Sequence, residues 1–168
     1  MKLPTQERRW CGIDSFISWV GGKKALRKLI YTMFPLNFDR YIEVFGGGGW
    51  VLFGRPPDCR CMEVYNDYNS NLANLFFCVK DRTWAFLKEL GFLPVNSRDE
   101  FTVIRRFLDK HEFDAPFLAE ELELAQVSLS VPEFEEIRAI LMENADVTDV
   151  KRAAAFFKLI RYSYGSGC

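Results

Sequence analysis

The sequence has little of what builds a metal site. Its five cysteines form no Cys-x-x-Cys pair, and the single histidine, His111, has no cysteine near it along the chain. Zinc sites need such clusters, so we expect no metal site and interpret the odd number of cysteines as reduced thiols. Cys78 lies on the apolar face of a predicted helix, and we expect it to be buried.

Long apolar runs are also missing. No stretch approaches the roughly 20 residues that span a membrane, and the N-terminus lacks the charged and then apolar pattern of a signal peptide. We therefore expect a cytoplasmic protein that does not enter a membrane. With 168 residues, 49% of them hydrophobic and 27% charged, the chain is long enough to bury one core.

Charge is unevenly distributed, although the net charge is only −1. Residues 1–40 carry eight Lys or Arg against three acids, residues 112–149 carry eleven carboxylates and one base, and residues 151–168 carry four bases and no acid. Basic ends around an acidic middle favour an anionic partner held at the ends. Ordinary solvated helix faces would give the same pattern, so both interpretations stay open.

Helices and strands are predicted to alternate over the first 80 residues. The pattern predicts a helix over 21–34, a strand over 41–45, a helical turn over 50–53, a strand over 61–66 and a helix after Asp67. The first helix should bury one apolar face, made of Leu26, Leu29, Ile30 and Met33. Such alternation predicts a parallel sheet covered by helices, and so an α/β fold class.

Beyond Lys80 the pattern becomes helical. Two capping boxes, Ser97-x-x-Glu100 and Ser130-x-x-Glu133, predict helix starts, the second helix burying Ile137 and its apolar neighbours, and a last helix is expected over 150–160. We therefore divide the chain into an α/β portion over 1–80 and a mainly helical region over 81–168, which we interpret as an insertion on the α/β unit.

Four consecutive glycines, Gly46 to Gly49, follow the first predicted strand. Glycine lets the backbone approach a ligand without a Cβ clash, so such a loop before a helix is typical of a nucleotide-type site. Asp67 lies twenty residues beyond Gly47, where an acidic side chain accepts hydrogen bonds from ribose hydroxyls in dinucleotide folds. We expect the glycine bend and this carboxylate to converge. A simple turn at the glycines and a helix-capping Asp67 are the alternatives.

Two common nucleotide motifs are disfavoured. Gly47-x-Gly49 is followed at the third fingerprint position by Leu52 where a dinucleotide site would have glycine. No Gly-Lys-Ser/Thr closes the loop, so the sequence does not match a P-loop either.

Three motifs, taken in order, resemble the opening motifs of the Dam-like, D12-class adenine-specific DNA methyltransferases. They are Ser-Trp-Val-Gly-Gly-Lys at 18–23, Glu-Val-Phe followed by four glycines at 43–49, and Asn-Asp-Tyr-Asn at 66–69. The resemblance implies a partial Rossmann-like S-adenosylmethionine-dependent methyltransferase sheet with a helical insertion. It also implies S-adenosylmethionine as cofactor and double-stranded DNA as substrate.

The resemblance further implies roles for single residues. Trp19 would lie flat on the cofactor, and Lys23 would reach its carboxylate or hold the loop. Asp67 would bind the ribose hydroxyls. The floor beneath the methionine part would be formed by Phe45, Gly46, Gly47, Gly48 and Gly49. Taken singly, Trp19 has an ordinary core aromatic as its alternative, and Lys23 a solvated cation near a helix start.

The end of the chain resembles the segment that leads into the family's DNA-contacting hairpin. Lys158, Arg161, Tyr162 and Tyr164 interleave bases with aromatic rings, which suits contact with phosphates and stacking on bases. Cations that stabilise a helix dipole are the alternative interpretation.

The family's Asp-Pro-Pro-Tyr motif is absent. In the family, the aspartate and a backbone carbonyl accept hydrogen bonds from the amine of a flipped adenine, on which the tyrosine stacks. The Pro56-Pro57 pair lies between Arg55 and Asp58, which is the wrong order. We expect no catalytic residue here and a truncated or split methyltransferase, inactive unless a complementary chain completes it.

The missing part would also supply the strand beside residues 41–45, which would otherwise be a bare apolar edge. A non-catalytic remnant that binds the cofactor or DNA is the alternative function. A methyltransferase for another substrate is disfavoured by the Trp-x-Gly-Gly-Lys opening at Trp19.

Overall fold

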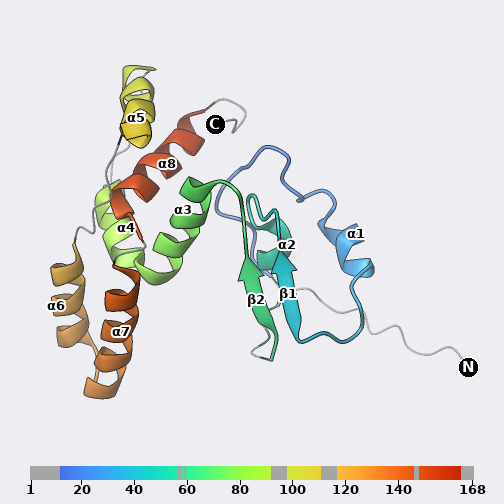
Figure 1. Cartoon of the computed structure of the whole chain (residues 1–168), viewed down its shortest axis with the longest axis horizontal. Coiled ribbons are helices and arrows are strands. Elements are labelled where there is room, and N and C mark those ends of the chain that lie inside the picture. Colours follow the sequence, from blue (N-terminus) through green and yellow to red (C-terminus); the bar gives the residue numbers. More distant parts are fainter. Residues whose placement is uncertain are drawn as a thin grey trace, which may run out of the picture. The chain divides into compact units, whose positions relative to one another are not determined.

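The computed structural model describes residues 12–56, 58, 60–91, 98–110, 117–145 and 148–163. The chain forms two compact units, Met1–Tyr68 and Asn69–Cys168, and their elements are labelled in Figure 1. The division expected at residue 80, between an α/β portion that binds the cofactor and a mainly helical region, stays a prediction.

Unit 1 alternates helices and strands. Its elements are α1 (Arg27–Thr32), β1 (Arg40–Glu43), α2 (Trp50–Phe53) and β2 (Met62–Tyr65). The strands pair in parallel, with Arg40 opposite Met62 and Glu43 opposite Tyr65. The predicted order and the parallel pairing are therefore confirmed, although each strand is shorter than expected. Within the described residues the sheet has these two strands alone, so a full Rossmann-like sheet stays a prediction.

The first helix differs from its prediction. Residues 20–26 form turns for most of their length, and α1 spans only Arg27–Thr32. Three residues of the expected apolar face are exposed, Leu26 at 56%, Leu29 at 61% and Met33 at 78%. Tyr31 is buried instead, because its ring packs edge-on against Phe34 and its hydroxyl donates to the Val51 carbonyl at 2.8 Å. The prediction of the buried face is wrong, because the spacing of apolar residues does not reveal a tyrosine ring that is buried while its hydroxyl finds a hydrogen-bond partner.

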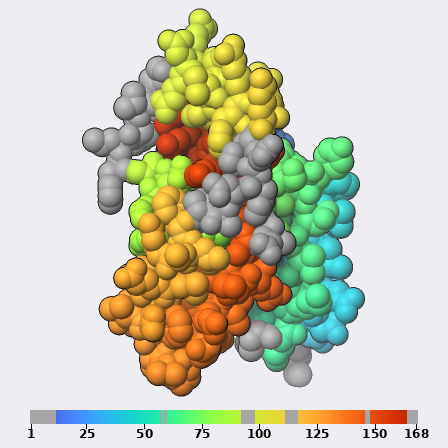
Figure 2. All heavy atoms as spheres, turned by 60° about the vertical axis from the view of Figure 1, so that its left-hand side comes forward, coloured from blue at the N-terminus to red at the C-terminus, as the bar shows by residue number. Residues whose placement is uncertain are grey.

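Unit 2 is helical in its described residues, as predicted. Its helices are α3 (Ser70–Asp81), α4 (Thr83–Leu90), α5 (Arg98–Lys110), α6 (Leu118–Ser128), α7 (Val131–Asn144) and α8 (Val150–Tyr162). Helix α8 contacts α3, α4 and α5, while α6 pairs with α7. Figure 2 shows the orange side chains of α6 and α7 lying against each other. None of these helices is long and apolar enough to cross a membrane over its described residues.

Several local predictions for unit 2 can be compared with the structure. Cys78 is fully buried, as expected, and burial raises the pKa of its thiol to about 12, so the thiol stays protonated. The capping box at Ser130 is present, with Glu133 accepting from the Ser130 amide at 3.1 Å. Ser97 lies outside the described residues. Ile137, expected inward, is 38% exposed.

A buried ion pair connects the helices of unit 2. Arg82 Nε lies 2.5 Å from Glu121 Oε2, and their side chains are 0% and 5% exposed. Arg82 also donates to Thr148 Oγ1 at 3.3 Å, and Glu121 Oε1 accepts from the Ala85 amide at 3.3 Å. Because both charges are withdrawn from water, each depends on the other for compensation.

Replacing Glu121 by Gln removes the charge that faces Arg82 and leaves a buried guanidinium without its counter-ion. We expect the free energy of unfolding to fall by about 3–5 kcal/mol, the usual cost of breaking a buried pair, as measured by urea unfolding.

The matched control is Glu120→Gln. Glu120 neighbours Glu121 on α6 and pairs with Lys88 at the surface, where loss of a pair costs about 0–1 kcal/mol. Equal losses in the two variants would contradict a special role for the buried pair.

Candidate functional site

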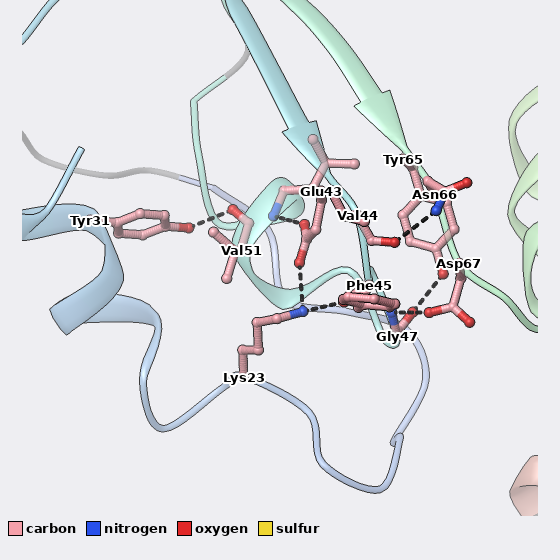
Figure 3. Close-up of polar contacts among 11 residues, drawn as sticks. Lys23, Tyr31, Glu43, Val44, Phe45, Gly47, Val51, Tyr65, Asn66 and Asp67 are labelled. Atoms are coloured by element: carbon pink, nitrogen blue, oxygen red, sulfur yellow. Dashed lines mark hydrogen bonds and ion pairs between the residues drawn. The ribbon is translucent and has the colours of Figure 1, made fainter. Parts of the chain in front are cut away.

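The candidate site lies where both strands of unit 1 end. The loop over 44–49 follows β1, and Asn66 and Asp67 follow β2 (Figure 3). Since the strands are parallel, their carboxyl ends meet at the same edge of the sheet. This edge is where open α/β sheets bind their ligands.

Backbone and amide hydrogen bonds hold the loop against the end of β2. The Gly46 amide donates to the Asn66 carbonyl at 2.9 Å, and the Asn66 side-chain amide donates to the Val44 carbonyl at 2.7 Å. Gly47 and Gly49 have φ angles of +52° and +69°, a left-handed conformation that glycine adopts without steric cost. The glycine run is therefore a tight turn with a defined shape.

Asp67 is brought to the middle of this loop. Its Oδ2 accepts a hydrogen bond from the Gly47 amide at 2.8 Å, and the Tyr65 hydroxyl donates to the Gly47 carbonyl at 2.8 Å (Figure 3). The bend and the carboxylate thus converge, as their spacing predicted. Helix α3 is capped by Asn69, whose side chain accepts from the Asn71 and Leu72 amides, so the alternative of Asp67 as its cap is wrong.

Glycines of the loop lie where a Cβ would be crowded by neighbouring side chains. A Cβ on Gly46 would lie 2.1 Å from the Tyr65 ring, and one on Gly47 would lie 3.0 Å from Trp19 Cδ1. The Trp19 indole is half-buried and faces the loop at Gly47. Trp19 therefore lies against the loop and is not enclosed in the core, and its contact with a cofactor stays a prediction.

Lys23 and Glu43 form an ion pair beneath the loop. Lys23 Nζ lies 3.2 Å from Glu43 Oε1 and also donates to the Phe45 carbonyl. Glu43, whose side chain is 4% exposed, accepts from the Leu52 amide through Oε2 at 2.9 Å. Glu43 belongs to the motif that precedes the glycines, and the sequence alone predicted no role for it. The available signal was a carboxylate inside an apolar strand, which needs a partner when buried.

The nearby charges affect the tyrosine at the end of β2. Burial raises the pKa of Tyr65, and the carboxylates of Asp67 and Glu43 raise it further. The hydroxyl therefore stays protonated and keeps donating to the loop.

Phe45, at the start of the loop, points outward and is 74% exposed. No cluster of three His, Cys, Asp or Glu suited to a metal occurs among the described residues.

The residues predicted to contact DNA lie at the end of α8, in unit 2. Arg161 is exposed in the last turn of the helix, while Lys158 and Tyr162 are half-buried. Tyr164 lies outside the described residues. A position in the last turn suits both phosphate contact and stabilisation of the helix dipole, so the DNA role stays a prediction.

Comparison with known proteins finds relatives that align with about half of this chain. The chain is 36% identical over 91 residues to "Type II methyltransferase M1.LlaDCHI" of Lactococcus lactis subsp. cremoris, covering 54% of this chain and 31% of that protein. It is 34% identical over 94 residues to the "DNA adenine methylase" of Serratia marcescens, covering 54% and 33%. "Type II methyltransferase M.MjaIII" of Methanocaldococcus jannaschii is 33% identical over 95 residues, covering 53% and 32%.

The match to these relatives is partial, because the chain spans about a third of their length. A family model covers far more of this chain. The model for the D12 class N6 adenine-specific DNA methyltransferases matches residues 19–164, which include both the glycine loop and α8. The chain therefore belongs to the D12 class of N6 adenine-specific DNA methyltransferases.

Proposed function

We propose that this chain binds S-adenosylmethionine at the carboxyl ends of β1 and β2 and serves in the N6 methylation of adenine in DNA. The single observation that carries the proposal is the hydrogen bond from the Gly47 amide to Asp67, 2.8 Å long. This hydrogen bond connects the glycine loop with a carboxylate. A ligand can approach the loop closely, and the carboxylate is suited to binding a ribose.

The chemistry of the loop fits an adenosyl ligand. The ribose carries two neighbouring hydroxyl donors, and a carboxylate has about four lone-pair positions to accept from them and from Gly47 together. Hydrogen bonds of this charged kind contribute about 1.5–3 kcal/mol. Asp67 is thus proposed to orient the ribose.

The remaining walls suit the other parts of the ligand. The exposed Phe45 ring offers a π face to a sulfonium cation, as aromatic rings do to other cations. Gly46, Gly47, Gly48 and Gly49 leave room for the methionine part, and the Trp19 indole would lie on the cofactor. When bound, the cofactor supplies the methyl group.

The adenine-holding part of the reaction must come from outside these residues. The 168 residues contain no Asp-Pro-Pro-Tyr motif, and without its acceptors the lone pair of the adenine amine stays delocalised into the ring. We propose that a further segment, either a continuation of the chain or a complementary chain, supplies that motif. DNA would be contacted through Lys158, Arg161, Tyr162 and Tyr164. A non-catalytic protein that binds the cofactor or DNA is the alternative.

Replacing Asp67 by Ala should weaken the binding of S-adenosylmethionine by about 10- to 100-fold, since charged hydrogen bonds to the ribose are lost. Isothermal calorimetry measures the affinity. The matched control is Asp39→Ala, because Asp39 is exposed and precedes β1 at the opposite end of the sheet. Equal affinities of wild type and Asp67→Ala would remove Asp67 from the site.

Replacing Gly47 by Ala should both destabilise the chain and abolish cofactor binding. A left-handed conformation costs a residue with a Cβ about 1–3 kcal/mol, and the new Cβ would meet Trp19. Gly21→Ala is the control, because Gly21 has a φ of +73° but nothing within 4 Å of its missing Cβ. Gly21→Ala should therefore lose stability and keep its affinity; a matching loss of affinity would argue against a shaped loop at Gly47.

The 168-residue chain should transfer no methyl group to DNA by itself, because the motif that holds adenine is missing. Incorporation of labelled methyl groups into adenine measures this. Addition of a segment that carries the Asp-Pro-Pro-Tyr motif should restore incorporation. Methylation above background by these residues alone would overturn the proposed division of labour.

A further inference from the structure

The Lys23–Glu43 pair contacts both ends of the glycine loop. At the entry, Lys23 Nζ donates to the Phe45 carbonyl. At the exit, Glu43 Oε2 accepts from the Leu52 amide at 2.9 Å, within the first turn of α2. The pair itself is closed by the 3.2 Å contact between Lys23 Nζ and Glu43 Oε1 (Figure 3).

Two roles for Lys23 make different demands on this arrangement. A lysine that binds the carboxylate of a ligand needs an ammonium whose charge is directed toward that ligand. Here two of its three donor hydrogens are directed at Glu43 and at Phe45. The charge of Lys23 is also compensated by Glu43, whose side chain is only 4% exposed, so the pair attracts a second carboxylate weakly.

The burial of Glu43 points in the same direction. A carboxylate withdrawn from water needs both an opposite charge and hydrogen-bond donors. Lys23 supplies the charge, and the Leu52 amide supplies one of the donors. Lys23 therefore compensates the charge of Glu43 in the absence of any ligand.

Resting on the proposed function, we infer that Glu43 and Lys23 are positioning residues, which fix the two ends of the glycine loop and do not bind the carboxylate of the cofactor. The loop then presents Gly47 to Asp67 in the observed geometry. Lys23 acts on the cofactor only through the shape of the loop.

The test compares two ligands that differ in one group. S-adenosylmethionine carries a carboxylate, and decarboxylated S-adenosylmethionine lacks it. Calorimetry on the 168-residue chain gives both affinities for wild type, Lys23→Met, Glu43→Gln and the double variant, with Lys28→Met as control because Lys28 is exposed on α1. We expect Lys23→Met and Glu43→Gln to weaken the binding of both ligands by similar factors of about tenfold or more, the size of a lost charged hydrogen bond. The affinity of the double variant should be no lower than that of the single variant that binds less tightly.

Amide hydrogen exchange separates positioning from general destabilisation. In both variants, exchange at the Gly47 and Leu52 amides should accelerate. The Met62 amide, which donates to the Asp39 carbonyl at the far end of the strands, should exchange as in wild type. Acceleration at Met62 to the same extent would assign the pair a merely structural role and overturn the inference.

The other outcomes are also decisive. If Lys23→Met weakens the binding of S-adenosylmethionine and not that of the decarboxylated ligand, then Lys23 binds the carboxylate. The inference then fails, while the proposed function stands. Unchanged affinities in Glu43→Gln would also overturn it. If wild type binds neither ligand, the proposed function fails, and this inference with it. Should Lys23→Met not fold, Lys23→Arg replaces it: equal weakening of both ligands supports positioning, and selective weakening of S-adenosylmethionine contradicts it.

Discussion

The parallel pairing of β1 with β2 is the constraint on which the site depends. It places the residues after Glu43 beside the residues after Tyr65, so that two segments twenty residues apart meet at one edge. The Gly47 amide can then reach Asp67 at 2.8 Å. Without that register the glycine loop would be an ordinary turn, and Asp67 would have no loop to face.

Local backbone chemistry gives the loop its shape. Gly47 and Gly49 adopt left-handed conformations, a Cβ on Gly46 would collide with the Tyr65 ring, and a Cβ on Gly47 would be tight against Trp19. Three of the loop amides are themselves hydrogen-bonded: Gly46 to the Asn66 carbonyl, Gly47 to Asp67 and Gly49 to the Gly46 carbonyl. Polar groups beneath the loop then hold it in place, so that a ligand would meet an already shaped surface, which lowers the entropic cost of binding.

The parallel strands and the convergence of the glycine loop with Asp67 could be predicted from the sequence. A glycine run indicates a tight turn, and the spacing from the glycines to Asp67 places both after predicted strands. The contacts of Glu43 and Lys23 could not be assigned, because the partner of a buried carboxylate depends on tertiary packing. The same holds for α1, where the burial of Tyr31 depends on a carbonyl of α2. The Arg82–Glu121 pair, which joins the residue between α3 and α4 to α6 across 39 residues, left no pattern along the chain.

The central claim is that these residues form one cofactor site at the carboxyl ends of β1 and β2. Titration of the isotope-labelled chain with S-adenosylmethionine, followed by amide NMR shifts, tests it most directly. The account predicts that the largest shifts occur at residues 45–49 and at Asn66 and Asp67, with small shifts at the opposite ends of the strands, near Arg40 and Met62. Shifts confined to unit 2, or none at saturating ligand, would contradict it.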